Sequence, residues 1–207
     1  MSSLDDTLYF YCRNDYWIIN NLLCGNMDLL WENIRFVIDD NIGVLKEAEQ
    51  GIRPPFDDEQ IARLKNRIFG DLDDAAKARI IEIARADIAN ILGAMAAAKN
   101  ELTLHRTVLI HDFAPYTKTI AHNIGDEIDF ANILSTSKTP GWGEDANCDF
   151  FAYIITIPPG GMILDLDNHW HNEPGEVLLP PGKFCITDIL PGKNPRCRGA
   201  IYMRSVL

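Results

Sequence analysis

Three short segments in the second half of the chain place polar side chains within apolar, strand-like surroundings. They contain, in chain order, Arg106 within Leu102–Val108, the triplet Ser135-Thr136-Ser137, and Glu176 before the run Val177–Leu179. A guanidinium held on a strand can bind a diphosphate, because its fork of N–H donors matches phosphate oxygens. Each segment alone is typical of something plainer: an edge-strand arginine reaching solvent, a solvated strand end, or a charge beside a hydrophobic run. Their occurrence together, in this order and on predicted strands, indicates a site.

The three segments together resemble the mono-ADP-ribosyltransferase family of toxins and effectors. In that family an arginine strand, an S-T-S strand and an E-V-L-L-P strand line one NAD cleft. The resemblance covers about residues 100–207 and rests on Arg106, Ser135-Thr136-Ser137 and Glu176–Pro180. It implies an enzyme that binds NAD as a substrate, cleaves the nicotinamide–ribose bond and transfers ADP-ribose to a protein or another macromolecule.

The resemblance also implies a role for individual residues. Cleavage of the bond develops positive charge on the ribose, much as in glycoside hydrolysis. Glu176 is the expected catalytic carboxylate that stabilises this charge. Arg106 would hold a phosphate or the ribose side of NAD, and Thr107 would bind the nicotinamide amide through its backbone. Ser135 would hold Arg106 and Glu176 in place by hydrogen bonds.

Two more residues complete the expected NAD site. Thr136 is one of the expected NAD-binding residues. We nevertheless expect Thr136 and Ser137 mainly to form the end of the strand and not to touch the substrate. Trp142 lies in the loop Thr139–Asp145, and the corresponding loop of the family lies over the nicotinamide and often supplies an aromatic ring for stacking. The loop lacks the arginine that many relatives carry there, and an exposed turn with an incidental tryptophan is the plainer interpretation.

The segment before Glu176 is expected to meet the acceptor. Relatives that modify arginine carry a second glutamate two residues before the catalytic one; here that position is Pro174, and Glu173 comes one residue too early. An arginine acceptor is protonated and needs a nearby carboxylate to orient it and take its proton. The sequence therefore predicts an acceptor other than arginine, with Thr, Ser, Asn, Gln or an acidic side chain open. His169, His171 or Glu173 would orient it.

Three other functions remain open. The first is an NAD glycohydrolase that uses water as the acceptor in the same cleft. The second is an NAD-binding module without turnover, against which the intact Arg106, Ser135 and Glu176 argue. The third is a cupin-like metal-binding protein, because His169, His171 and Glu176 are apt ligands for Fe, Mn or Zn. A cupin needs another histidine further along, and none follows His171, so no metal site is expected.

The elements that must position these residues change character near residue 100. Before it, apolar residues recur at helical spacing, most clearly in Ile80, Ala84, Ile88, Ile91 and Met95. After it, β-rich runs alternate with Gly- and Pro-rich turns. We predict an α+β fold, with a helical N-terminal lobe over residues 1–100 and a mostly antiparallel, two-sheet β core over residues 101–207 that binds NAD. The predicted strands are Leu102–Ile110, Ile133–Ser137, Phe150–Ile157, Met162–Leu166, Glu176–Leu179, Phe184–Ile189 and Ala200–Val206.

Composition restricts the partners and the compartment. A net charge of −11 disfavours nucleic acid and anionic lipid as partners, and no apolar run approaches the roughly 20 residues that cross a bilayer. The acidic N-terminus lacks the pattern of a signal peptide. The five cysteines are scattered, with no CxxC spacing, as in ordinary thiols of a reducing compartment. We therefore expect a cytoplasmic protein, acting in its own cell or in a host cell after delivery.

Overall fold

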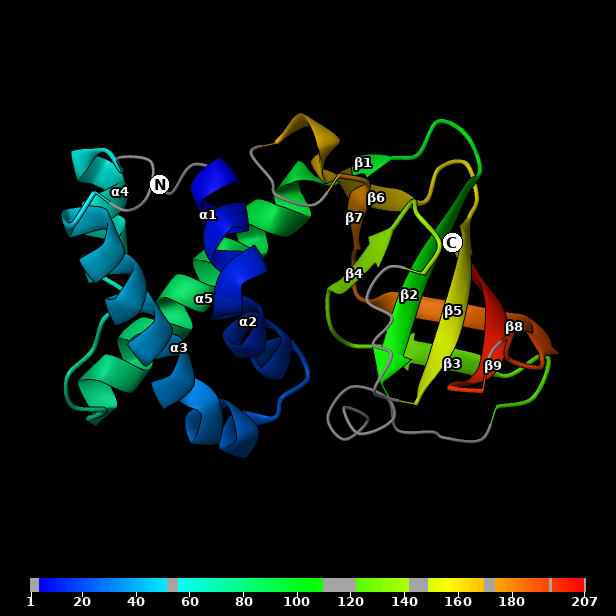
Figure 1. The fold of residues 1–207 in the computed structure, drawn as a ribbon, viewed down its shortest axis with the longest axis horizontal. Helices are drawn as coiled ribbons and strands as arrows, with labels where there is room; N and C mark the ends of the chain where they lie inside the picture. Colours follow the sequence, from blue (N-terminus) through cyan, green and yellow to red (C-terminus); the bar gives the residue numbers. More distant parts are fainter. Residues whose placement is uncertain are drawn as a thin grey trace. The chain divides into compact units, whose positions relative to one another are not determined.

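The computed structural model describes residues 4–51, 56–109, 122–141, 149–169, 174–193 and 195–206. They form two compact units, Met1–Gly93 and Ala94–Leu207, the first built of helices and the second of strands (Figure 1). The division comes a few residues before the expected boundary at residue 100, because strand β1 (Ala96–Ala97) pairs with β6 (Met162–Asp165). Within the described ranges, no helix is long and apolar enough to cross a membrane.

The first unit is helical, as the periodicity predicts. The residues of the predicted long helix that recur every third or fourth position, among them Ile80, Ala84 and Ile91, are buried on one side of α5. The helices are α1 (Leu4–Phe10), the π-helical turn η1 (Tyr11–Asp15), α2 (Tyr16–Leu23), α3 (Met27–Glu49), α4 (Asp58–Lys65) and α5 (Asp74–Ala94).

A buried charge network lies at the centre of the helical unit. The Arg67 guanidinium donates to Asp15 at 3.0 Å and to Asp87 at 2.6 Å, and it lies 4.1 Å from the centroid of the Phe10 ring. The Thr7 hydroxyl donates to Asp87 as well, at 3.2 Å. Burial outweighs the nearby Arg67 and raises the pKa of Asp15 to about 6, and it also raises the pKa of Asp87.

This network predicts how the stability of the helical unit depends on pH. The folded unit holds a proton on Asp15 more tightly than the unfolded chain, where the pKa is about 3.9. The resulting stabilisation is complete below about pH 4 and is lost as the pH rises through about 6. We therefore expect the thermal midpoint, followed by far-UV circular dichroism, to fall between about pH 5 and about pH 8. Asp15→Asn should reduce that fall. Asp39→Asn, at an exposed site on α3, is the control, and an equal fall in both variants would contradict the assignment.

The second unit is a single nine-stranded sheet in the order β1-β6-β7-β4-β2-β5-β9-β8-β3. Neighbouring strands are antiparallel except for β5 and β9, which are parallel. Every predicted strand is present: Phe150–Ile157 and Glu176–Leu179 have the predicted bounds, and the other five have shifted ends. β1 and β3 were not predicted, and Ile110 lies outside the described residues. The remaining bounds are β2 (Leu102–Leu109), β3 (Glu127–Phe130), β4 (Leu134–Ser137), β5 (Phe150–Ile157), the 3-10 turn η3 (Leu166–Asn168), β7 (Glu176–Leu179), β8 (Gly182–Leu190) and β9 (Cys197–Ser205).

The α+β class is thus confirmed, whereas the expectation of two sheets is replaced by one mixed sheet that curls. β3 is last in the strand order and β4 is fourth, yet only Ala131–Ile133 join Phe130 to Leu134. Four Cα steps span at most about 15 Å, whereas five strand positions in a flat sheet span about 24 Å. The sheet must therefore bend back over itself, so that one sheet forms both sides of the core.

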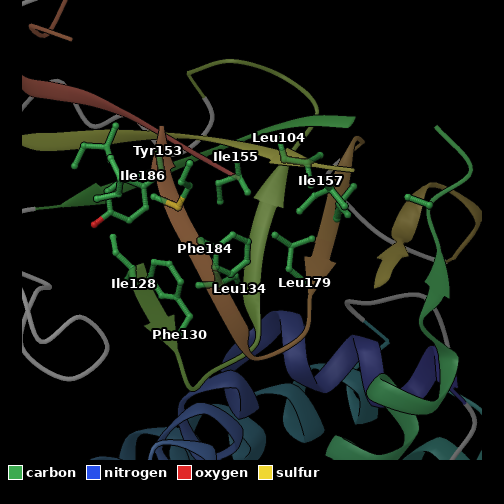
Figure 2. Close-up of a cluster of buried hydrophobic side chains, with 14 residues drawn as sticks. Leu104, Ile128, Phe130, Leu134, Tyr153, Ile155, Ile157, Leu179, Phe184 and Ile186 are labelled. Atoms are coloured by element: carbon green, nitrogen blue, oxygen red, sulfur yellow. The ribbon is translucent and has the colours of Figure 1, made fainter. Parts of the chain in front are cut away.

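The core of the strand unit reflects this curl. Figure 2 shows Phe130 of β3, Phe184 of β8 and Leu134 of β4 gathered below Leu104 of β2 and Ile155 of β5. These side chains are all less than 5% exposed. Strands from the β3 end of the order and from its middle therefore share one apolar cluster, which also includes Val177 and Leu179 of β7.

Candidate active site

The ladder between β2 and β4 stops at the predicted arginine. Between these two fully described strands, the residue pair in register is His105 with Ser137, whereas β2 pairs with β5 over its whole length. Continuation of the ladder would place Arg106 opposite Thr136. Instead, Nη1 of Arg106 donates to the backbone carbonyl of Ser135 at 2.5 Å. The guanidinium thus occupies the point at which the backbone pairing ends.

The next pair of strands brings the predicted glutamate to the same serine. β4 and β7 pair along their full length, with Ser137 opposite Glu176. Because side chains alternate along a strand, Ser135 and Glu176 lie diagonally on one face of this pair. The Ser135 hydroxyl donates to Oε1 of Glu176, and Glu176 is only 6% exposed. Ser135 therefore joins Arg106 through its carbonyl and Glu176 through its hydroxyl.

The side chains of the other two residues of the triplet, Thr136 and Ser137, form hydrogen bonds with nearby backbone groups at the end of β4. Thr136 is fully buried, and its hydroxyl donates to the carbonyl of Val177 at 2.7 Å. Ser137 is also buried, and its hydroxyl accepts a hydrogen bond from the N–H of Thr139 at 3.0 Å. For Thr136 this arrangement favours a structural contribution over a contact with a ligand.

The remaining predicted residues are distributed around this centre. Thr107 is half-buried and lies on β2 opposite Ala152 of β5. His169 follows η3 and donates its backbone N–H to the carbonyl of Leu166. Trp142, His171 and Glu173 lie outside the residues that the structure describes. In the part of the chain that is described, no group of three or more His, Cys, Asp or Glu side chains could hold a metal ion.

Tyr153 is a polar residue of this region that sequence reasoning missed. It lies on β5 directly opposite Arg106 and is only 1% exposed. Among the described residues its hydroxyl has no hydrogen-bond partner, and burial raises the pKa of Tyr153 to about 12, although Arg106 counteracts this rise. The phenol therefore stays neutral and can donate a hydrogen bond. Within the apolar run Phe150–Ile157 nothing distinguishes this tyrosine from a core residue until the register is known.

Solved structures with the same fold share this architecture along the whole chain. The SpvB ATR domain of Salmonella aligns with a TM-score of 0.57 at 16% identity over 100% of both chains. The catalytic domain of VahC from Aeromonas hydrophila aligns at 0.56 and 16% identity, also over 100% of both. An ADP-ribosyltransferase from Clostridium botulinum aligns at 0.53 and 14% identity, over 99% of this chain and 87% of its own.

These likenesses define the fold of the chain. The resemblance to mono-ADP-ribosyltransferases seen in the sequence is confirmed at the level of the fold, because a solved ADP-ribosyltransferase matches 99% of the chain. No family model matches the sequence, and no curated protein does either.

The position of Thr136 generates a prediction about stability. Thr136→Val keeps the shape of the side chain but removes the donor to the Val177 carbonyl, so the free energy of unfolding should fall by about 1–2 kcal/mol. Thr136→Ser should retain most of it. Urea unfolding measures both, with Thr103→Val at an exposed position of β2 as the control. A loss no larger than that of the control would show that the hydrogen bond contributes nothing.

Proposed function

We propose that this chain is an NAD-dependent mono-ADP-ribosyltransferase that cleaves the nicotinamide–ribose bond and transfers ADP-ribose to a protein. The observation that carries the proposal is the hydrogen-bonded series Arg106–Ser135–Glu176, on strands of a fold shared with the ADP-ribosyltransferase from Clostridium botulinum. A diphosphate-binding cation and a carboxylate joined through one residue are the two groups that this reaction requires of the protein.

The chemistry assigns Glu176 to the reacting sugar. When the bond from the ribose C1′ to the nicotinamide nitrogen breaks, its electron pair leaves with nicotinamide, which becomes neutral, and positive charge develops on the ribose. The Glu176 carboxylate stabilises this charge and orients the ring through a ribose hydroxyl. The acceptor then forms its bond to C1′; a hydroxyl or amide acceptor releases a proton in this step, whereas a carboxylate has none to release.

The neighbouring residues hold this geometry. Arg106 binds a phosphate of NAD, which the fixed guanidinium fork suits. Ser135 keeps the guanidinium and the carboxylate at a constant separation, because it bonds to both. Thr107 contributes its backbone to the nicotinamide amide, and Trp142 is retained as the aromatic residue that stacks on that ring. The cytoplasm, of the producing cell or of a recipient cell, supplies the NAD.

The acceptor is a side chain other than arginine. Pro174, in the position two residues before Glu176, is exposed and has no group that takes a proton. In arginine transfer a carboxylate must orient the guanidinium and deprotonate it. A neutral or anionic acceptor, such as a hydroxyl, an amide or a carboxylate, lacks the positive charge of a guanidinium and fits this segment better.

The first test removes the charge of the catalytic carboxylate. Glu176→Gln nearly keeps the size of the side chain and can still accept from Ser135, so the fold should persist. Release of nicotinamide from NAD should fall about 100-fold or more, as expected when electrostatic stabilisation of a transition state is lost. Glu127→Gln, an exposed glutamate of β3, is the matched control. Activity within a few-fold of the wild type would exclude Glu176 from the reaction.

The second test concerns the acceptor. Free agmatine, which carries a guanidinium, should not be modified at a rate above simple NAD hydrolysis, whereas mass spectrometry of a lysate treated with labelled NAD should find modified peptides. Pro174→Glu should introduce agmatine modification by restoring the missing carboxylate. Efficient agmatine modification by the wild type, abolished by Glu173→Ala, would refute the assignment and show that Glu173 takes this role.

A further inference from the structure

A set of side-chain and backbone hydrogen bonds joins the residue directly before Glu176 to residues at or just after the ends of β4 and β6. Nζ of Lys138 donates to Asp165 and to Asp167, both at 2.6 Å. The second carboxylate, Asp167, also accepts the backbone N–H of Gly175 at 2.7 Å. The backbone N–H of Lys138 donates to the carbonyl of Gly175 at 2.8 Å. We refer to Lys138, Asp165, Asp167 and Gly175 as the Lys138 clasp.

The clasp fixes the residue directly before the predicted catalytic glutamate. Both backbone polar groups of Gly175 are bonded within it, the N–H to a side chain and the carbonyl to the N–H of Lys138. Gly175 has a φ of 85°, a left-handed conformation that glycine adopts at little cost. Because Ser137 is paired with Glu176 and Lys138 follows Ser137, the clasp extends the β4–β7 pairing by one residue. The direction in which the chain enters Glu176 is therefore set by side chains outside the arginine–serine–glutamate series.

We propose that the Lys138 clasp, and Asp167 above all, positions Glu176 for NAD cleavage. This inference rests on the proposed function and adds positioning residues to it. Asp167 lies between the two halves of the clasp, since one carboxylate holds both the Lys138 ammonium and the Gly175 amide. Without this carboxylate the Gly175 N–H loses the Asp167 acceptor, and within the clasp the residue before Glu176 keeps only the backbone bond from the Lys138 N–H to its carbonyl. A misplacement of a catalytic group by about 1 Å is enough to reduce a rate by about 100-fold.

The clasp is suited to positioning more than to stability. The side chains of Lys138, Asp165 and Asp167 are 35%, 37% and 42% exposed, and ion pairs with this much exposure add little to the free energy of folding. Burial lowers the pKa of Lys138, but its hydrogen bonds to Asp165 and Asp167 outweigh this and raise it. Lys138 therefore remains a cation at any physiological pH, and variants of the clasp should fold.

The decisive comparison is Asp167→Ala against Asp167→Asn. Alanine removes both contacts of the carboxylate, whereas the asparagine oxygen can still accept the Gly175 N–H. In nicotinamide release we expect kcat to fall about 10- to 100-fold in the alanine variant, with KM for NAD changed less than about 3-fold. The asparagine variant should recover to within about 5-fold of the wild type. Lys183→Met, which removes an exposed lysine paired with Glu127, controls for the loss of a surface ion pair elsewhere in the same unit.

A second measurement does not depend on activity. Amide hydrogen exchange at Gly175, followed by NMR, should be at least about 10-fold faster in Asp167→Ala than in the wild type and nearly unchanged in Asp167→Asn. Equal exchange in the wild type and the alanine variant, or equal kcat, would overturn the inference. If the wild type itself releases no nicotinamide, the proposed function fails, and the exchange rates alone decide whether the clasp holds the residue before Glu176.

Discussion

The hydrogen bonding of Ser135 is the constraint on which the rest of the site depends. Its carbonyl accepts from Arg106 of β2 and its hydroxyl donates to Glu176 of β7, so one residue of β4 links three strands of the sheet. A carboxylate buried as deeply as Glu176 requires donors, because an unsatisfied charge in such a place is costly. The same serine thus satisfies the buried carboxylate and sets its separation from the cation.

This linkage requires an interruption of the sheet. In a regular ladder, backbone groups of β2 and β4 would continue to bond to each other beyond His105 and Ser137. The Ser135 carbonyl would then accept a backbone N–H of β2 in place of the Arg106 guanidinium. Instead, β2 pairs with β5 along its whole length but with β4 only at His105 and Ser137. Arg106 replaces the missing backbone partner, and the buried hydroxyl of Tyr153 lies opposite it on β5. The irregular part of the sheet is therefore the part that bears the polar groups.

Local patterns were sufficient for much of the fold. Helical spacing in the first unit and alternating apolar runs in the second predicted the α+β class and every observed strand except β1 and β3. β3 was not predicted because Glu127–Phe130 is only four residues long and half of them are charged. β1 was not predicted because it consists of two alanines. The curl was missed for a different reason: it follows from the short connection between β3 and β4, which has meaning only once the strand order is known.

The sequence by itself determined which chemical groups are available and that each lies on a strand: Arg106, the hydroxyl of Ser135 and the carboxylate of Glu176. Only the tertiary structure decided what they contact, because the register joins strands that are 29 to 41 residues apart along the chain, and local propensity carries no information about such pairings. It also decided that Thr136 faces the core, while its neighbour Ser135 faces Glu176. The contacts of Asp167 could not be predicted from the sequence either, since no spacing in the sequence relates Asp167 to both Lys138 and Gly175. Those contacts exist because β6, β7 and β4 are neighbours in the sheet, and their register brings the ends of β6 and β4 beside the start of β7.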